Sequence, residues 1–192
     1  MSINARQLAP GAVYHITHRG NNRMPIFNTD QDRAVYLKYL EEALDGRSFK
    51  VHAYCLMGNH IHMLVSADDP LDIPAVLQLV HGRYGRYFNL SWHRSGSVWH
   101  RRYRSKRIET DEHLIRSFQY LDMNPVRKRM VSRPDEWEWS SYRSLASGKP
   151  SPVLSLHESY AALGKDTTQR CLAYRARMDQ FLAEWLALSS FQ

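Results

Sequence analysis

Two hydrophobic runs separated by a short turn lie before the middle of the chain. The first covers residues 49–56 and the second residues 60–65, in which His60 and His62 alternate with bulky hydrophobic residues. Side chains of a strand alternate between its two faces, so the two histidines must point the same way. A Gly-Asn pair at 58–59 is typical of a two-residue hairpin turn. The pattern therefore predicts a β-hairpin that presents two imidazoles side by side.

The rest of the hydrophobic pattern predicts further elements on both sides of this hairpin. Residues 13–18 alternate as a strand does, and residues 97–108 read as a strand or an extended loop. Hydrophobic residues recur at helical spacing over 30–44, over 74–90 and after Thr110. Thr110 is a good N-cap, so the third of these helices is expected to begin there. The order strand, helix, hairpin, helix, strand, helix indicates an α+β domain.

The helix after Thr110 carries a second candidate site. Tyr120 and Asn124 lie off its hydrophobic stripe and, being four residues apart, are expected to share one face. Pro125 is expected to end the helix near Asn124. The basic residues 127–129 follow directly. A partly exposed tyrosine beside an amide and next to positive charge is a candidate reactive group.

The C-terminal part of the chain reads as packing segments and helices. Residues 137–142 are expected to pack through their aromatic side chains, and residues 148–152 read as a linker. Helices are expected over about 156–163 and 168–188. We therefore expect one domain over residues 1–147 and a C-terminal helical extension over residues 148–192.

The composition points to a polyanionic partner. The chain has 192 residues, 43% of them hydrophobic, and a formal net charge of +7. That length and hydrophobic content allow a real core, and the charge favours a nucleic acid. Cys55 and Cys171 are far apart, so no disulfide partner is expected. Residues 1–7 show no apolar signal core and no run is long enough to cross a membrane, so a cytoplasmic protein with no membrane partner is expected.

Basic residues interleaved with aromatic ones mark the segment after residue 97. Five of the seven residues from Arg101 to Arg107 are basic, which favours DNA contacts over the alternative of a strand edge protected by charge. In a regular strand Arg102 and Arg104 share one face, and we favour that pair for DNA, with Trp99 and Tyr103 on the more apolar face. The candidate DNA contacts are Arg19, Asn21, Asn22, Arg23, Arg83, Arg86, Arg101, Arg102, Arg104, Lys106, Arg107, Arg127 and Lys128.

Four segments in order resemble the REP-associated tyrosine transposases, where REP stands for repetitive extragenic palindrome. Residues 53–62, which read Ala-Tyr-Cys-Leu-Met-Gly-Asn-His-Ile-His, look like the family signature. Residues 14–23, 119–127 and 137–142 are similar to its first strand and loop, its tyrosine helix and its late aromatic motif. The family belongs to the single-tyrosine HUH transposases, in which two histidines flank a bulky residue. Gly58 stands where many members have proline, and both residues suit a turn.

The resemblance, which covers about residues 8–146, implies a fold and a site. The fold would be ferredoxin-like, with an antiparallel sheet that carries the histidines and helices on its other face. His60, His62 and Asn124 would bind Mg²⁺ or Mn²⁺, and Tyr120 would be the nucleophile. Residues 1–147 would form the HUH catalytic domain.

The resemblance also implies a reaction, which is DNA transposition through a strand transfer. The substrate would be single-stranded DNA with a REP-type hairpin, cut to give a 5′-phosphotyrosine intermediate and a free 3′-OH. The protein would act as a monomer or a homodimer. Two alternatives stay open: a non-catalytic hairpin-DNA binder that keeps the fold, and a zinc-dependent hydrolase. Two histidines and an amide are a poor ligand set for zinc, which prefers a third histidine, a cysteine or a carboxylate.

Overall fold

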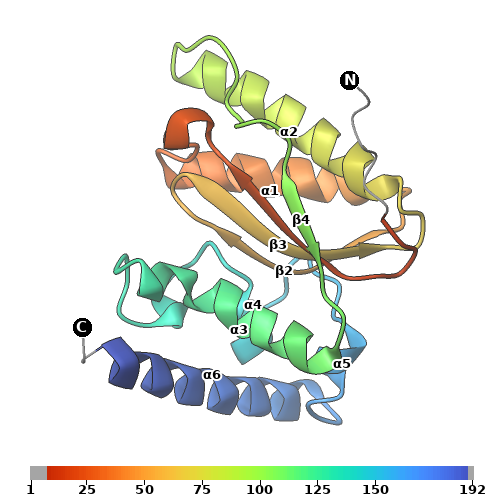
Figure 1. Cartoon of the computed structure of the whole chain (residues 1–192), viewed down its shortest axis with the longest axis vertical. Coiled ribbons are helices and arrows are strands. Elements are labelled where there is room, and N and C mark those ends of the chain that lie inside the picture. Colours follow the sequence, from red (N-terminus) through yellow and green to blue (C-terminus); the bar gives the residue numbers. More distant parts are fainter. Residues whose placement is uncertain (1–7, 190–192) are drawn as a thin grey trace.

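The computed structural model describes residues 8–189 and contains one four-stranded antiparallel sheet (Figure 1). The strands are β1 (Tyr14–Arg19), β2 (Phe49–Leu56), β3 (His60–Ala67) and β4 (Arg104–Arg107). Their order across the sheet is β2-β3-β1-β4. With α1 (Asp30–Leu44) between β1 and β2, and α2 (Asp72–Ser91) between β3 and β4, this is the ferredoxin-like arrangement. The predicted fold class is confirmed.

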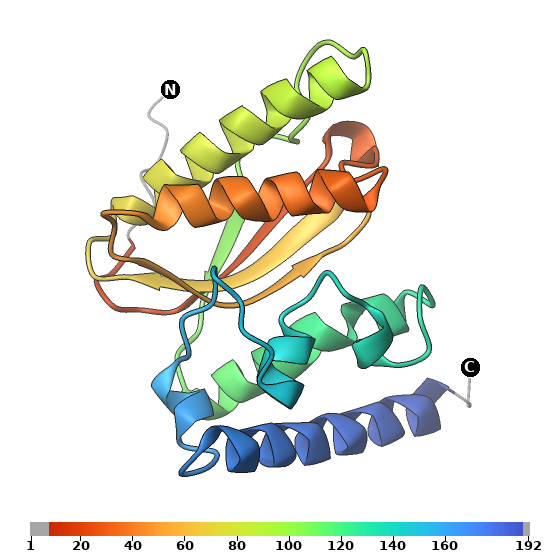
Figure 2. The ribbon, with the colours of Figure 1, turned by 180° about the vertical axis from the view of Figure 1, so that it is seen from behind.

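Helices α1 and α2 cover one face of the sheet (Figure 2). The predicted bounds of α1 are confirmed, and it begins with a capping box between Thr29 and Asp32. Ile16 of β1 and Met63 of β3 belong to the fully buried core on this side, together with Tyr84 of α2. The alternation that buries these residues sends their strand neighbours to the opposite face.

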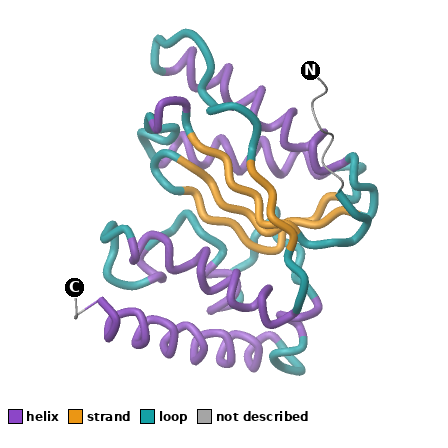
Figure 3. The backbone as a smooth tube through the Cα atoms, in the orientation of Figure 1, coloured by secondary structure: helices purple, strands orange, loops and turns teal. Residues whose placement is uncertain are grey.

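The opposite face carries the histidines and is covered by helices as well. There α3 (Asp111–Arg127) crosses the sheet, and α6 (Thr167–Ser189) lies along α3 on the side away from it (Figures 1 and 3). Ala53, Cys55 and Leu64 on this face are fully buried in a second core with residues of α3. Because these strand residues are apolar, the face needs a covering layer. The helices that the resemblance implied on the other face are present as α1 and α2, and α3 adds a second layer on the histidine face.

The end of α3 also differs from the prediction, because the helix continues through Pro125 to Arg127. Proline has no N–H for the carbonyl of Leu121, four residues earlier. The Asn124 side-chain amide compensates: its Nδ2 donates to the Tyr120 carbonyl at 2.9 Å and lies 3.5 Å from that of Leu121. The freed carbonyl therefore keeps a donor nearby, and the helix gains one more turn.

The segment between α3 and α6 covers the outer edge of β2. It contains η2 (Pro134–Glu136), α4 (Tyr142–Ser147) and α5 (Glu158–Ala161). The Leu56 N–H donates to the Trp139 carbonyl at 2.8 Å, and the Ser141 N–H donates to the Tyr54 carbonyl at 2.9 Å. These bonds occupy an edge that would otherwise be open to pairing with another strand. The predicted aromatic packing segment is thus part of the sheet margin.

A buried carboxyl fastens α3 to α6. Asp122 of α3 is fully buried and accepts hydrogen bonds from Tyr174 Oη of α6 at 2.7 Å and from Ser141 Oγ at 3.3 Å. Burial raises the pKa of Asp122 to about 7, although these hydroxyls oppose the shift. Beside it, Gln119 Nε2 donates to the Arg177 carbonyl at 2.8 Å. The helix that carries Tyr120 is therefore hydrogen-bonded to α6 on its side away from the sheet.

No helix within residues 8–189 combines the length and the apolar character needed to cross a bilayer. Residues 1–7, on which we based the absence of a signal sequence, lie outside the described residues, as do residues 190–192 of the predicted extension.

Candidate active site

The two histidines of β3 lie side by side beneath α3. Their ring centroids are 4.9 Å apart, and both side chains are largely buried. His60 Nδ1 bonds to Asn59 Oδ1 at 2.7 Å. His62 Nδ1 lies 2.9 Å from His15 Nε2 and 3.3 Å from Thr17 Oγ1. In each ring Nδ1 is engaged by a neighbour, so Nε2 is the nitrogen left for a ligand.

Burial keeps both imidazoles in their neutral form. It lowers the pKa of His60 to about 4, and the positive charges of Arg19 and Lys128 add to the shift. The pKa of His62 falls well below its usual value, first through burial and then through His60 and His15. Only a neutral imidazole offers a lone pair to a metal ion. Both rings therefore have the protonation state of a metal ligand at neutral pH.

Tyr120 extends from α3 toward the same group. Its ring centroid lies 6.2 Å from that of His62 and 6.2 Å from that of His15. The side chain is 37% exposed, so it also reaches solvent. The guanidinium carbon of Arg127 lies 4.8 Å from the centre of the ring, within cation–π range. A tyrosine hydroxyl, two neutral imidazoles and a positive charge thus come together from β3 and α3.

Asn124 lies one helical turn after Tyr120 within α3, as the spacing of four residues predicts. It is more deeply buried, with 4% exposed against 37% for Tyr120. Since Nδ2 donates to the backbone of its own helix, Oδ1 is the atom that remains for a ligand. Within residues 8–189 no three or more His, Cys, Asp or Glu side chains are arranged to hold a metal ion. Among these described residues, the two imidazoles therefore have no carboxylate or thiol beside them as a further metal ligand.

His15 is a site residue that sequence reasoning missed. It lies on β1, where the antiparallel register pairs Thr17 with His62 and His15 with Leu64. Burial lowers the pKa of His15 to about 4, followed by the charges of Lys106 and His113. The alternation within residues 13–18 indicates one face for His15 and Thr17. Only the register between the strands shows that this face is the one with the catalytic candidates.

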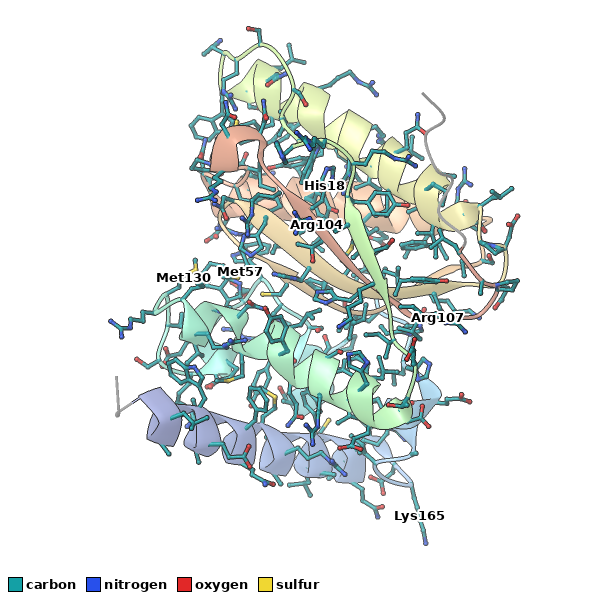
Figure 4. The ribbon with its side chains drawn as sticks, viewed as in Figure 1. His18, Met57, Arg104, Arg107, Met130 and Lys165 are labelled. Atoms are coloured by element: carbon teal, nitrogen blue, oxygen red, sulfur yellow. The ribbon has the colours of Figure 1, made fainter. Side chains whose placement is uncertain are left out.

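Strand β4 brings two basic side chains to the histidine face. Arg104 pairs with Thr17 and Lys106 with His15, and directly paired residues of antiparallel strands share a face. Both are exposed, and Figure 4 shows Arg104 near one end of β4. We expected Arg102 as the companion of Arg104, but Arg102 precedes the strand. The pair on this face is therefore Arg104 and Lys106.

The aromatic residues of this segment lie in the opposite core. Trp99 stacks on His18 with ring centroids 4.6 Å apart, and its Nε1 donates to the His81 carbonyl at 3.0 Å. Tyr103 is 8% exposed in the same core. Neither ring is available for stacking on a base, in agreement with our preference from strand alternation.

The remaining basic candidates divide between two places. The loop η1 (Asn21–Arg23) lies beside the histidine hairpin, because Asn59 Nδ2 donates to the Arg23 carbonyl at 3.0 Å. Arg19 pairs with His60 in the strand register, and Arg127 and Lys128 end α3 near the site. Arg83, Arg86 and Arg107 lie on the other side of the sheet, and Arg101 and Arg102 lie in the segment before β4.

Arg83 and Arg86 belong to α2, on the layer that covers the other face of the sheet. Arg83 is paired with Glu42 at 2.6 Å and lies over the ring of Tyr39 at 4.3 Å. Arg101 and Arg102 precede β4, and Arg107 shares the face of Tyr14. The structure thus separates Arg83, Arg86 and Arg107 from Tyr120 by the sheet.

Comparisons with known proteins place the chain. A REP-associated tyrosine transposase bound to a REP hairpin is 17% identical and has a TM-score of 0.63, covering 82% of this chain and 93% of that one. At this identity it shows a shared fold. A transposase candidate from Deinococcus radiodurans is also 17% identical, with a TM-score of 0.43, and covers 64% of this chain and 96% of that one. No curated protein sequence matches.

The model of the IS200-like transposase family matches residues 10–124, more than half of the sequence. The chain therefore belongs to the IS200-like transposase family.

Proposed function

We propose that the protein is a metal-dependent single-stranded DNA endonuclease and strand transferase acting on REP-type hairpins. The observation that carries the proposal is the position of Tyr120, partly exposed and 6.2 Å from the ring of His62. A solved structure with this fold is a REP-associated tyrosine transposase bound to a REP hairpin, which supports the choice of substrate.

The residues present fit a divalent ion. His60 and His62 would bind Mg²⁺ or Mn²⁺ through Nε2, since both rings are neutral and both Nδ1 atoms are engaged. Asn124 would add Oδ1, because its amide nitrogen is used within α3. Three protein ligands leave coordination positions for a phosphate group. When bound, such an ion withdraws negative charge from the phosphoryl oxygens of the DNA.

The chain's own nucleophile carries out the covalent step. The Tyr120 hydroxyl gives its proton to solvent water, and its oxygen attacks a phosphorus atom of the DNA. As the new P–O bond forms, the bond to the 3′ oxygen breaks, and that oxygen takes up a proton and leaves as a 3′-OH. Arg127 beside the ring favours the negative charge that develops on the tyrosine oxygen. The 5′-phosphotyrosine diester keeps the bond energy, so another 3′-OH can reseal the strand without ATP.

Basic side chains around this group would hold the DNA backbone. Arg104 and Lys106 of β4 flank the site from one side, and Arg19, Arg127 and Lys128 from the other. A protein that neutralises phosphates with lysine and arginine releases the counterions of the DNA. Hairpin binding should therefore weaken steeply as the salt concentration rises.

Replacing both Arg104 and Lys106 by alanine should flatten that salt dependence. Each lost contact with a single strand lowers the slope of log affinity against log salt by about 0.7, so the double variant should lose about 1.4. A salt titration of hairpin binding measures the slope. The control replaces the exposed Lys165 and Arg175 of the C-terminal extension by alanine, which removes the same charge elsewhere. Equal slopes in the wild type and the β4 variant would place DNA elsewhere.

The proposed activity has a direct test. The protein is incubated with Mn²⁺ and a single-stranded REP-type hairpin labelled 3′ of the expected cut, and the mixture is then denatured. We expect labelled DNA bound covalently to protein together with an unlabelled product that ends in 3′-OH. Hairpin binding without cleavage would favour the non-catalytic binder, and cleavage without an adduct would favour a hydrolase.

We further propose that residues 1–147 form the catalytic domain and that the extension 148–192 supports it. The bonds from Tyr174 to Asp122 and from Gln119 to the Arg177 carbonyl support this division of roles.

A further inference from the structure

His15 contacts a proposed metal ligand but has no role in the function described so far. Its Nε2 lies 2.9 Å from His62 Nδ1. The two histidines are 47 residues apart in the sequence, and the register of β1 against β3 brings them together. Thr17 Oγ1 approaches the same nitrogen at 3.3 Å, which is long for a hydrogen bond. Of the two neighbours, His15 makes the closer contact.

The position of one proton decides what His62 can bind. A neutral imidazole carries its proton on Nδ1 or on Nε2, and the other nitrogen has the lone pair. For Nε2 of His62 to bind a metal ion, the proton must lie on Nδ1, where it needs an acceptor. His15 Nε2 is that acceptor when the proton of His15 lies on its own Nδ1. The reverse arrangement, with His15 donating, would place the His62 proton on Nε2 and block the ligand atom.

The other proposed ligand has the equivalent arrangement in simpler form. His60 Nδ1 bonds to the amide oxygen of Asn59 at 2.7 Å, and an amide oxygen only accepts. His60 is thereby fixed with Nε2 free. His62 has a histidine in the place where His60 has an amide oxygen.

We propose that His15 is a positioning residue that accepts the Nδ1 proton of His62 and so holds His62 Nε2 ready for a divalent ion. This inference rests on the proposed metal site of His60 and His62. Acceptors behind metal-bound histidines fix both the tautomer and the direction of the ring, and their loss typically weakens metal binding about 10–100-fold.

Two substitutions at one position separate this role from packing. In His15→Leu the side chain has no acceptor, so Mn²⁺ should bind about 10–100-fold more weakly. In His15→Gln the amide oxygen lies near the place of the imidazole Nε2, so most of the wild-type affinity should return. Binding is measured without DNA, by titrating Mn²⁺ and following the signal of the free ion in electron paramagnetic resonance. Thermal unfolding of each variant verifies that it is folded.

A second measurement reads the tautomer itself. With ¹⁵N-labelled histidine in metal-free protein, the nitrogen shifts of His62 should report a proton on Nδ1 in the wild type and in His15→Gln. In His15→Leu the shifts should move toward the tautomer with the proton on Nε2. A change in packing alone would not produce this pattern, because Gln and Leu both fill space.

The outcomes distinguish the inference from the function on which it rests. A wild-type protein that binds no Mn²⁺ would overturn the metal site and the inference together. Tight Mn²⁺ binding in the wild type and equally tight binding in His15→Leu would overturn the inference alone. The inference also fails if His15→Gln loses as much affinity as His15→Leu, since an acceptor would then not suffice.

Discussion

Replacing Tyr120 by phenylalanine should abolish strand cleavage and the covalent adduct while leaving hairpin binding nearly unchanged. The substitution removes the only atom that would attack phosphorus but keeps the ring, which packs near His62 and lies beside Arg127. The basic side chains that would hold the DNA are untouched. A denaturing gel measures cleavage and adduct formation with labelled hairpin DNA, and a titration of the same DNA measures binding.

Tyr39→Phe is a matched control for this experiment. Tyr39 is a half-buried tyrosine on α1, in the helical layer on the other face of the sheet, where Arg83 lies over its ring. The Tyr39→Phe protein should cleave the hairpin DNA as the wild type does. If the Tyr120→Phe protein still forms the adduct, the nucleophile is another residue.

Replacing either His60 or His62 by alanine should reduce cleavage far more than hairpin binding. Each substitution removes one proposed nitrogen ligand and with it the positioning of the phosphate, but leaves the positive surface in place. EDTA should stop cleavage by the wild type, and added Mg²⁺ or Mn²⁺ should restore it. Full activity in EDTA would rule out the metal role.

The pH dependence gives a further reading of the same site. Because burial holds the pKa of His60 at about 4 and that of His62 well below its usual value, Mn²⁺ binding should persist at about pH 5.5. Ordinary imidazoles, with a pKa of about 6.5, would be mostly protonated there. His93→Asn is the control for the substitutions of His60 and His62. His93 is exposed in the loop after α2, and its positive φ of 47° suits asparagine.

The fold was predictable wherever a local pattern determines structure. Helical spacing gave the bounds of α1, and strict alternation in β3 placed His60 and His62 on one face. Thr110 accepts from the His113 N–H as the expected N-cap. Each of these features depends on residues only a few positions apart.

Two of the three misses lie where distant segments meet. The contact between His15 and His62 depends on the register of β1 against β3, which no local pattern specifies. The cover on the histidine face depends on where α3 packs. The helix end was misjudged because Pro125 alone argues for a stop, whereas the Asn124 amide offers the carbonyls near it a donor. In the first two cases the deciding partner lies far away in the sequence, and in the third it is the residue next to Pro125.

The buried bond between Asp122 and Tyr174 has a consequence for how such sequences diverge. Losing the phenol would leave a carboxyl in apolar surroundings with the Ser141 hydroxyl at 3.3 Å, and losing the carboxyl would leave a buried hydroxyl. Each single change is costlier than both changes made together. Across relatives that keep the extension, positions 122 and 174 should therefore covary, although the match to the family model ends at residue 124. What is inherited with the proposed nucleophile Tyr120 would then include a helix beyond the residues that match the family model.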